Sequence, residues 1–168
     1  MSPAAWQAAK LAAVLLVAGL LQAAFADGFR LWGGQPDLLL TTALVGAMFC
    51  GEGGSALLGF FASLIHASLA APPHGGVGAY LVSGTLACFG IGWLEGRVYR
   101  DSMVVAAAVV VLGTLAAECL FLLLCPQPSF WRWARTGSIT LAWNTVLSVP
   151  CHFVIRRLLG AHGAGDQK

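Results

Sequence analysis

The stretch GGQPDLLLTTALVGAMF, residues 33–49, decides how the chain is organised, because it places a carboxylate directly before an apolar run. Pro36 suits the first position of a helix, where its missing N–H costs nothing. Asp37 would then lie in the first turn, where free backbone amides and the positive end of the helix dipole favour a carboxylate. We expect a short apolar helix to begin here, with Asp37 at the outer membrane interface beside Trp32 and within reach of Arg30.

The composition is that of a membrane protein. Hydrophobic residues make up 58% of the 168 residues and charged residues 10%, whereas ordinary soluble domains carry about 25% charged residues. A helix that crosses the hydrocarbon core uses about 20 residues, so the spans leave no room for a soluble domain of useful size. The formal net charge of +2 is small and scattered, which argues against nucleic acid as a partner.

Charged residues and prolines divide the chain into six apolar segments. They predict an all-α integral membrane protein with six transmembrane helices in a single polytopic domain, residues 1–168. The segments are residues 8–26, 37–50, 54–71, 77–95, 102–124 and 137–158, followed by a polar tail, 159–168. The first segment also resembles a cleavable signal peptide, but we expect it to be retained as a transmembrane helix. The second is short, about 21 Å at 1.5 Å per residue, and requires packing without tilt, a locally thinned bilayer or a re-entrant path.

The basic residues predict the orientation, because cytoplasmic loops are enriched in Lys and Arg. With six spans and the N-terminus inside, most of them fall on the cytoplasmic side, and both termini are expected there. The cytoplasmic set is Lys10, Arg97, Arg100, Arg156, Arg157 and Lys168, and the outer set is Arg30, Arg132 and Arg135. The cytoplasmic arginines could bind anionic lipid as easily as protein, and the lipid interpretation is preferred.

Small residues recur at every fourth position in the third and fourth segments. The rows are Gly51, Ser55, Gly59, Ser63, Ala67 and Ala71, and Gly84, Cys88, Gly92 and Gly96. Residues four apart share a helix face, and small faces let helix backbones approach closely in lipid. We expect these two helices to pack together in the interior. The alternative is that a sequence rich in Gly and Ala produces such rows by chance.

Placing a polar residue within a transmembrane span costs free energy, so each such residue is expected to have a structural or functional role. Glu118 and Asn144 are predicted to lie at nearly the same depth on antiparallel helices, so we expect a hydrogen bond between them. Thr140, Asn144 and Ser148 share one face of the last segment. Pro150 follows on the next turn and should kink this helix. A proton-relay role for Glu118 lacks a second acid at its depth.

No catalytic or metal-binding pattern is present in the sequence. No two of the five cysteines form a CxxC pair, and we interpret them as small apolar residues. The four histidines do not have metal-ligand spacing, and HExxH, GxSxG and Gly-rich phosphate loops are absent. We therefore expect a protein without catalytic residues, cofactor or metal.

Four stretches together resemble a known family. They are QPDLLLTTALVGA, GGSALLGFFASLIHASL, GAYLVSGTLACFGIGWLEGRVYR and SITLAWNTVLSVPCHFVIRRLL, and they cover residues 35–158. In this order they resemble MreD, the rod shape-determining membrane proteins of bacteria. The most specific pieces are Pro36-Asp37, Asn144, Leu147, Pro150 and the pair Arg156-Arg157.

The resemblance implies a non-enzymatic member of the cell-elongation complex in the bacterial inner membrane. Its implied partners are an MreC-type periplasmic coiled-coil protein, an MreB-type actin-like filament, and the elongation glycosyltransferase with its class B penicillin-binding protein. The family is also similar in fold to the substrate-binding subunits of energy-coupling vitamin transporters. This similarity supplies an alternative function, which predicts a ligand cavity in the outer half. A third possibility is a generic assembly or quality-control membrane protein.

The sequence departs from the family pattern at two positions. Members commonly carry an aspartate where this chain has Ser63, and a basic residue where it has Gln35. A helix-packing role for Ser63 survives this change, whereas any role that needs the charge of an aspartate does not.

Overall fold

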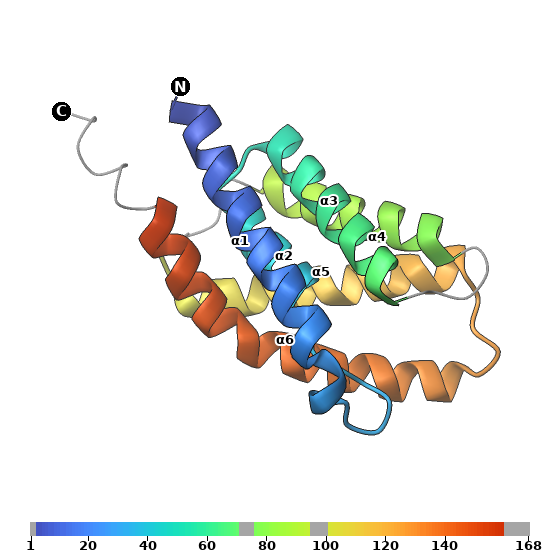
Figure 1. Cartoon of the computed structure of the whole chain (residues 1–168). Helices are drawn as coiled ribbons and strands as arrows, with labels where there is room; N and C mark the ends of the chain where they lie inside the picture. The colour runs from blue at the N-terminus through green and yellow to red at the C-terminus, as the bar shows by residue number, and fades with distance from the viewer. Residues whose placement is uncertain (1–2, 71–75, 95–100, 160–168) are drawn as a thin grey trace.

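The computed structural model describes residues 3–70, 76–94 and 101–159. Over these residues, six α-helices and one short 3-10 helix follow one another along the chain (Figure 1). They are α1 (Pro3–Phe25), η1 (Ala26–Phe29), α2 (Leu38–Ala47), α3 (Glu52–Ala70), α4 (Gly76–Trp93), α5 (Met103–Leu124) and α6 (Phe130–Leu159). The all-α expectation is confirmed for this part of the chain.

Four helices in the described part are long and apolar enough to cross a membrane, namely α1, α4, α5 and α6. These helices give the chain the character of a multi-pass membrane protein. α2 has only 10 residues, a length of about 15 Å, and α3 is not among the four. Six full spans and the location of both termini stay predictions. Several predicted features lie outside the described residues: Arg97, Arg100, Lys168 and the tail beyond residue 159.

The short helix α2 lies at the centre of the assembly. All five other α-helices contact it. A helix with apolar residues on every side is stable only when it is surrounded. Its buried residues are Leu39, Thr41, Thr42, Ala43, Leu44, Val45, Gly46 and Ala47. The expectation that the third and fourth segments are the interior helices is therefore wrong, since α3 and α4 both expose large apolar side chains such as Leu57 and Leu86.

The helices α3 and α4 do pack through the predicted small residues. A Cβ atom added to Gly59 would lie 2.6 Å from the carbonyl oxygen of Gly84, and one added to Gly92 would lie 2.6 Å from the Cβ atom of Ser55. An added Cβ on Gly84 would meet the Ser63 side chain. The two backbones therefore approach more closely than larger residues would allow, as the fourfold spacing predicts. Two residues of the predicted rows lie outside the described residues: Ala71 and Gly96.

The last helix is longer than the sequence predicts. α6 has 30 residues and begins at Phe130 rather than at Gly137. The Ser129 hydroxyl accepts a hydrogen bond of 3.4 Å from the backbone N–H of Arg132, as serine commonly does before the first turn of a helix. Pro150 lies inside the helix, which changes direction along its length (Figure 1). A bend is expected where proline removes a backbone hydrogen bond.

Candidate functional site

The start of α2 is held by hydrogen bonds from three parts of the chain. Asp37 is the N-cap, and its Oδ1 atom accepts from the backbone N–H of Leu40 at 2.9 Å. The Gln22 side chain in α1 accepts from the backbone N–H of Leu38 at 2.7 Å and donates to the carbonyl oxygen of Pro36 at 2.9 Å. The backbone N–H of Asp37 donates to Oδ1 of Asn144 in α6 at 2.9 Å.

These contacts refine the sequence prediction for this helix start. The carboxylate does cap the helix, as expected from the free amides of a first turn. However, Asp37 is the residue before the helix rather than within its first turn, and Pro36 precedes the cap. Arg30 lines the same cavity as Asp37 and donates to Gln35 at 3.2 Å, whereas Trp32 lies under Arg135 at 5.4 Å.

The second oxygen of Asp37 meets a histidine. Oδ2 of Asp37 lies 3.2 Å from Nδ1 of His66 in α3, and the two side chains are only 13% and 11% exposed. The cap therefore lies inside the protein and not at its edge. The His66 ring packs on Tyr80 with centroids 4.9 Å apart, and Tyr80 packs on Phe121 at 4.5 Å. The close contact between the Asp37 carboxylate and the His66 ring, together with the row of three rings, thus joins the start of α2 to α3, α4 and α5.

The expected hydrogen bond between Glu118 and Asn144 is wrong. Oε2 of Glu118 accepts from the indole N–H of Trp133 at 3.2 Å. The Asn144 amide instead donates to the Thr114 hydroxyl at 3.3 Å and accepts from the backbone of Asp37. Thr114 lies one helical turn before Glu118 on α5, so Asn144 meets the predicted face of α5 at a greater depth.

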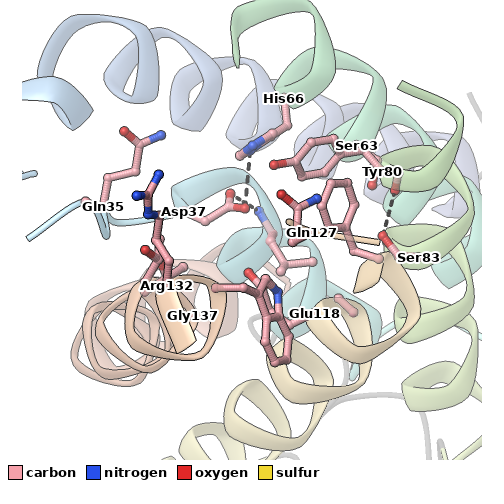
Figure 2. Close-up of a pocket in the computed structure, with 18 of the residues that line it drawn as sticks. Gln35, Asp37, Ser63, His66, Tyr80, Ser83, Glu118, Gln127, Arg132 and Gly137 are labelled. Atoms are coloured by element: carbon pink, nitrogen blue, oxygen red, sulfur yellow. Dashed lines mark hydrogen bonds and ion pairs between the residues drawn. The ribbon is translucent and has the colours of Figure 1, made fainter. Parts of the chain in front are cut away.

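A cavity of about 370 Å³ lies beside this helix start. Figure 2 shows polar side chains from the start of α2, from α3, α4, α5 and α6, and from the connections before α2 and α6 around it. The residues that line it are Arg30, Gly33, Gln35, Asp37, Leu40, Ala62, Ser63, His66, Tyr80, Ser83, Gly84, Ala117, Glu118, Phe121, Gln127, Pro128, Ser129, Arg132, Trp133, Thr136, Gly137 and Thr140. The volume and the mixture of aromatic and polar side chains are typical of small-molecule sites, which measure about 300–1,000 Å³.

The remaining sequence-predicted residues divide between this cavity and other regions. Ser63 lines the cavity, whereas Gly59 lies in the contact between α3 and α4. Pro150 is in the second half of α6, where Arg156 forms an ion pair of 3.1 Å with Asp101 and Arg157 is exposed. The predicted polar face of α6 is confirmed: Thr140 reaches the cavity, and Asn144 and Ser148 are fully buried.

Sequence reasoning missed His66, Gln22, Tyr80 and Trp133 as members of this site. His66 was considered only as a metal ligand, and within the described residues no group of three His, Cys, Asp or Glu side chains could hold a metal ion. Ionisable residues are rare in apolar segments, and those that occur there usually pair with one another. This rule is the sequence signal that could have identified His66. Applied to Asp37, that rule points to another ionisable side chain on a neighbouring helix, and His66 is one such residue.

No protein-family model matches the chain, and the comparisons with curated proteins and with solved structures also give no match.

Proposed function

We propose that this chain is a non-enzymatic, MreD-type membrane protein of the bacterial cell-elongation complex. The observation that supports this function is the hydrogen bond of 2.9 Å from the backbone N–H of Asp37 to Oδ1 of Asn144. The Pro36-Asp37 pair and Asn144 are the most specific parts of the resemblance, and they are far apart in the sequence. Their direct contact in the protein core supports the view that they form one structural unit.

In this function the chain resides in the bacterial inner membrane with six membrane-crossing segments and both termini in the cytoplasm. It acts as a scaffold between an MreC-type periplasmic protein, an MreB-type filament and the enzymes of lateral wall synthesis. The exposed apolar side chains of the outer helix faces, among them Leu57, Phe61 and Leu86, are available to lipid and to membrane segments of such partners.

The test is depletion of the protein in its rod-shaped host, with co-purification of the full-length chain from the same cells. Depleted cells should become round, and an MreC-type protein should co-purify. Complementation with Asp37→Asn, which keeps a capping oxygen, separates folding from partner binding. A host that keeps its rod shape throughout depletion would refute the proposal.

The cavity favours a second candidate, the substrate-binding subunit of an energy-coupling vitamin transporter. Such a subunit needs a site of this size lined by aromatic and polar side chains, and the cavity of about 370 Å³ meets that requirement. This function predicts co-purification with an ATP-hydrolysing module and a thermal shift with a vitamin. Loss of vitamin uptake with normal cell shape after depletion would select it over the scaffold.

A further inference from the structure

Two ionisable side chains in the cavity have no ion-pair partner among the residues that the structure describes. Glu118 is half-buried on α5, and its one hydrogen bond there is from the neutral indole of Trp133. The guanidinium group of Arg132, at the start of α6, makes no ion pair in that part of the chain. For the partly buried Glu118, a negative charge is costly unless an opposite charge or a strong hydrogen bond compensates it. Arg132 is exposed to solvent and does not bear this cost.

Among the residues that the structure describes, no other ionisable group of the cavity forms an ion pair with Glu118 or Arg132. Asp37 and His66 are paired with each other at 3.2 Å, and Arg30 is held at the Gln35 side chain. Glu118 and Arg132 line the same cavity from neighbouring helices without contacting one another. Figure 2 shows both around one open space, with Arg132 beside Gln35. The cavity therefore presents a separate anionic position and a separate cationic position to whatever enters it.

The walls next to Glu118 suit a cationic group. Trp133 and Phe121 both line the cavity, and aromatic faces attract ammonium groups within about 6 Å of the ring. The free carboxylate oxygen adds a charge-assisted hydrogen bond, which is about twice as strong as a neutral one. The Arg132 end suits a carboxylate or phosphate group, because the planar guanidinium can bind either with two parallel hydrogen bonds.

We propose that the cavity binds a small zwitterion, with its ammonium group at Glu118 and its anionic group at Arg132. The volume of about 370 Å³ holds an amino-acid-sized molecule or the headgroup of an aminophospholipid. Both sources present the same chemistry, an ammonium group a few bonds from a carboxylate or phosphate. This inference rests on the cavity alone and stands whether or not the chain belongs to the elongation complex.

The experiment measures binding to the purified full-length chain in detergent by isothermal titration calorimetry. The probes are phosphoethanolamine, which is a free zwitterion, and dioctanoyl-phosphatidylethanolamine, which carries the same headgroup on a lipid. Dioctanoyl-phosphatidylglycerol serves as the anionic control, because it has the phosphate without the ammonium group. Binding of phosphoethanolamine identifies a free ligand, whereas binding of the ethanolamine lipid alone identifies a headgroup site. Equal binding of the glycerol lipid, or no binding of either ethanolamine probe at millimolar concentration, would overturn the proposal.

The variants locate the two charged groups of the ligand. Glu118→Gln keeps an oxygen for the Trp133 N–H and the shape of the wall, yet removes the negative charge. Arg132→Gln changes an exposed side chain, so it tests the other end without endangering the fold. Each should weaken binding by about tenfold or more, as expected for a hydrogen bond to a charged group.

Matched control variants remove the same charges elsewhere in the chain. Arg135→Gln lies on the same helix as Arg132 but faces Trp32 and does not line the cavity. Glu52→Gln removes an exposed carboxylate from the first turn of α3. Both should bind the ethanolamine probe like the unchanged chain. If all four variants keep the original affinity, or if the controls lose as much affinity as the cavity variants, the assignment of Glu118 and Arg132 is wrong.

Discussion

Replacement of Gly59 by alanine tests the close approach of α3 to α4. The new Cβ atom would lie 2.6 Å from the carbonyl oxygen of Gly84 and 2.7 Å from the Cβ atom of Cys88, whereas ordinary van der Waals contact begins at 3.4 Å. Both obstructing atoms belong to the backbone or lie next to it, so α4 as a whole must move. Overpacking of this kind costs about 1–3 kcal/mol, and the higher helix propensity of alanine offsets about 0.5–1 kcal/mol. We expect a net loss of about 1–2 kcal/mol in the free energy of unfolding.

The assay is reversible unfolding of the purified chain in mixed detergent micelles, with Gly90→Ala as the matched control. Gly90 lies within α4, and a Cβ added there meets nothing within 4 Å. The control therefore gains helix propensity without overpacking, and it should be as stable as the unchanged chain or slightly more stable. If Gly59→Ala unfolds at the same detergent composition as Gly90→Ala, the two helices do not approach as closely as the structure indicates.

Three further predictions concern the start of α2, each measured in the same unfolding assay. Asn144→Leu should lower the free energy of unfolding by about 2 kcal/mol or more, because it leaves the partly buried N–H of Asp37 without its acceptor, whereas Thr114→Val should lower it by about 1 kcal/mol. Asp37→Ala should be less stable than Asp37→Asn by about 1 kcal/mol, since only the amide keeps an oxygen for the Leu40 N–H; equal stability would argue against the cap. Gln22→Leu should lower the free energy of unfolding by about 1–3 kcal/mol, because the Leu38 N–H loses its acceptor. An unchanged unfolding midpoint would contradict this prediction.

The helices themselves were largely predictable from the sequence. Apolar segments, prolines and charges placed all six helices, because a helix in lipid requires a continuous apolar run. The pairing of α3 with α4 was also predictable, since small residues four apart mark the side where backbones can meet. Gly59 and Gly84 form this contact as the spacing predicts. What the spacing did not reveal is that the shortest helix, α2, is the central one.

The wrong partner for Asn144 has a specific cause. Its depth was counted from a helix start at Gly137, whereas α6 begins at Phe130 and adds about two turns. Asn144 therefore lies deeper than Glu118 and meets Thr114 at 3.3 Å instead. Helix periodicity identifies the helix face on which a residue lies. The depth of that residue in the membrane depends on where the helix begins, and α6 begins in a segment of mixed polarity.

The pairing of Asp37 with His66 could not be derived from helix periodicity, because it depends on how two separate helices are rotated about their axes. The cavity depends in the same way on five helices and two connections. A sequence pattern describes one helix at a time, so a site shared among helices is visible only as unexplained polar residues. Glu118 is such a residue, and its indole partner Trp133 lies in the first turn of α6, before the predicted start of that helix.

The hydrogen bonds around the start of α2 constrain the order in which the chain can be assembled during translation. The acceptor for the Asp37 amide is Asn144, which the ribosome adds more than a hundred residues later. Until then the first turn of the central helix lacks one of its partners, although Gln22 is already in place. The nascent chain must therefore hold α2 in an unfinished state while α3, α4 and α5 are synthesised around it. The centre of this protein therefore gains its last backbone partner only after α5 and the first half of α6 have been synthesised.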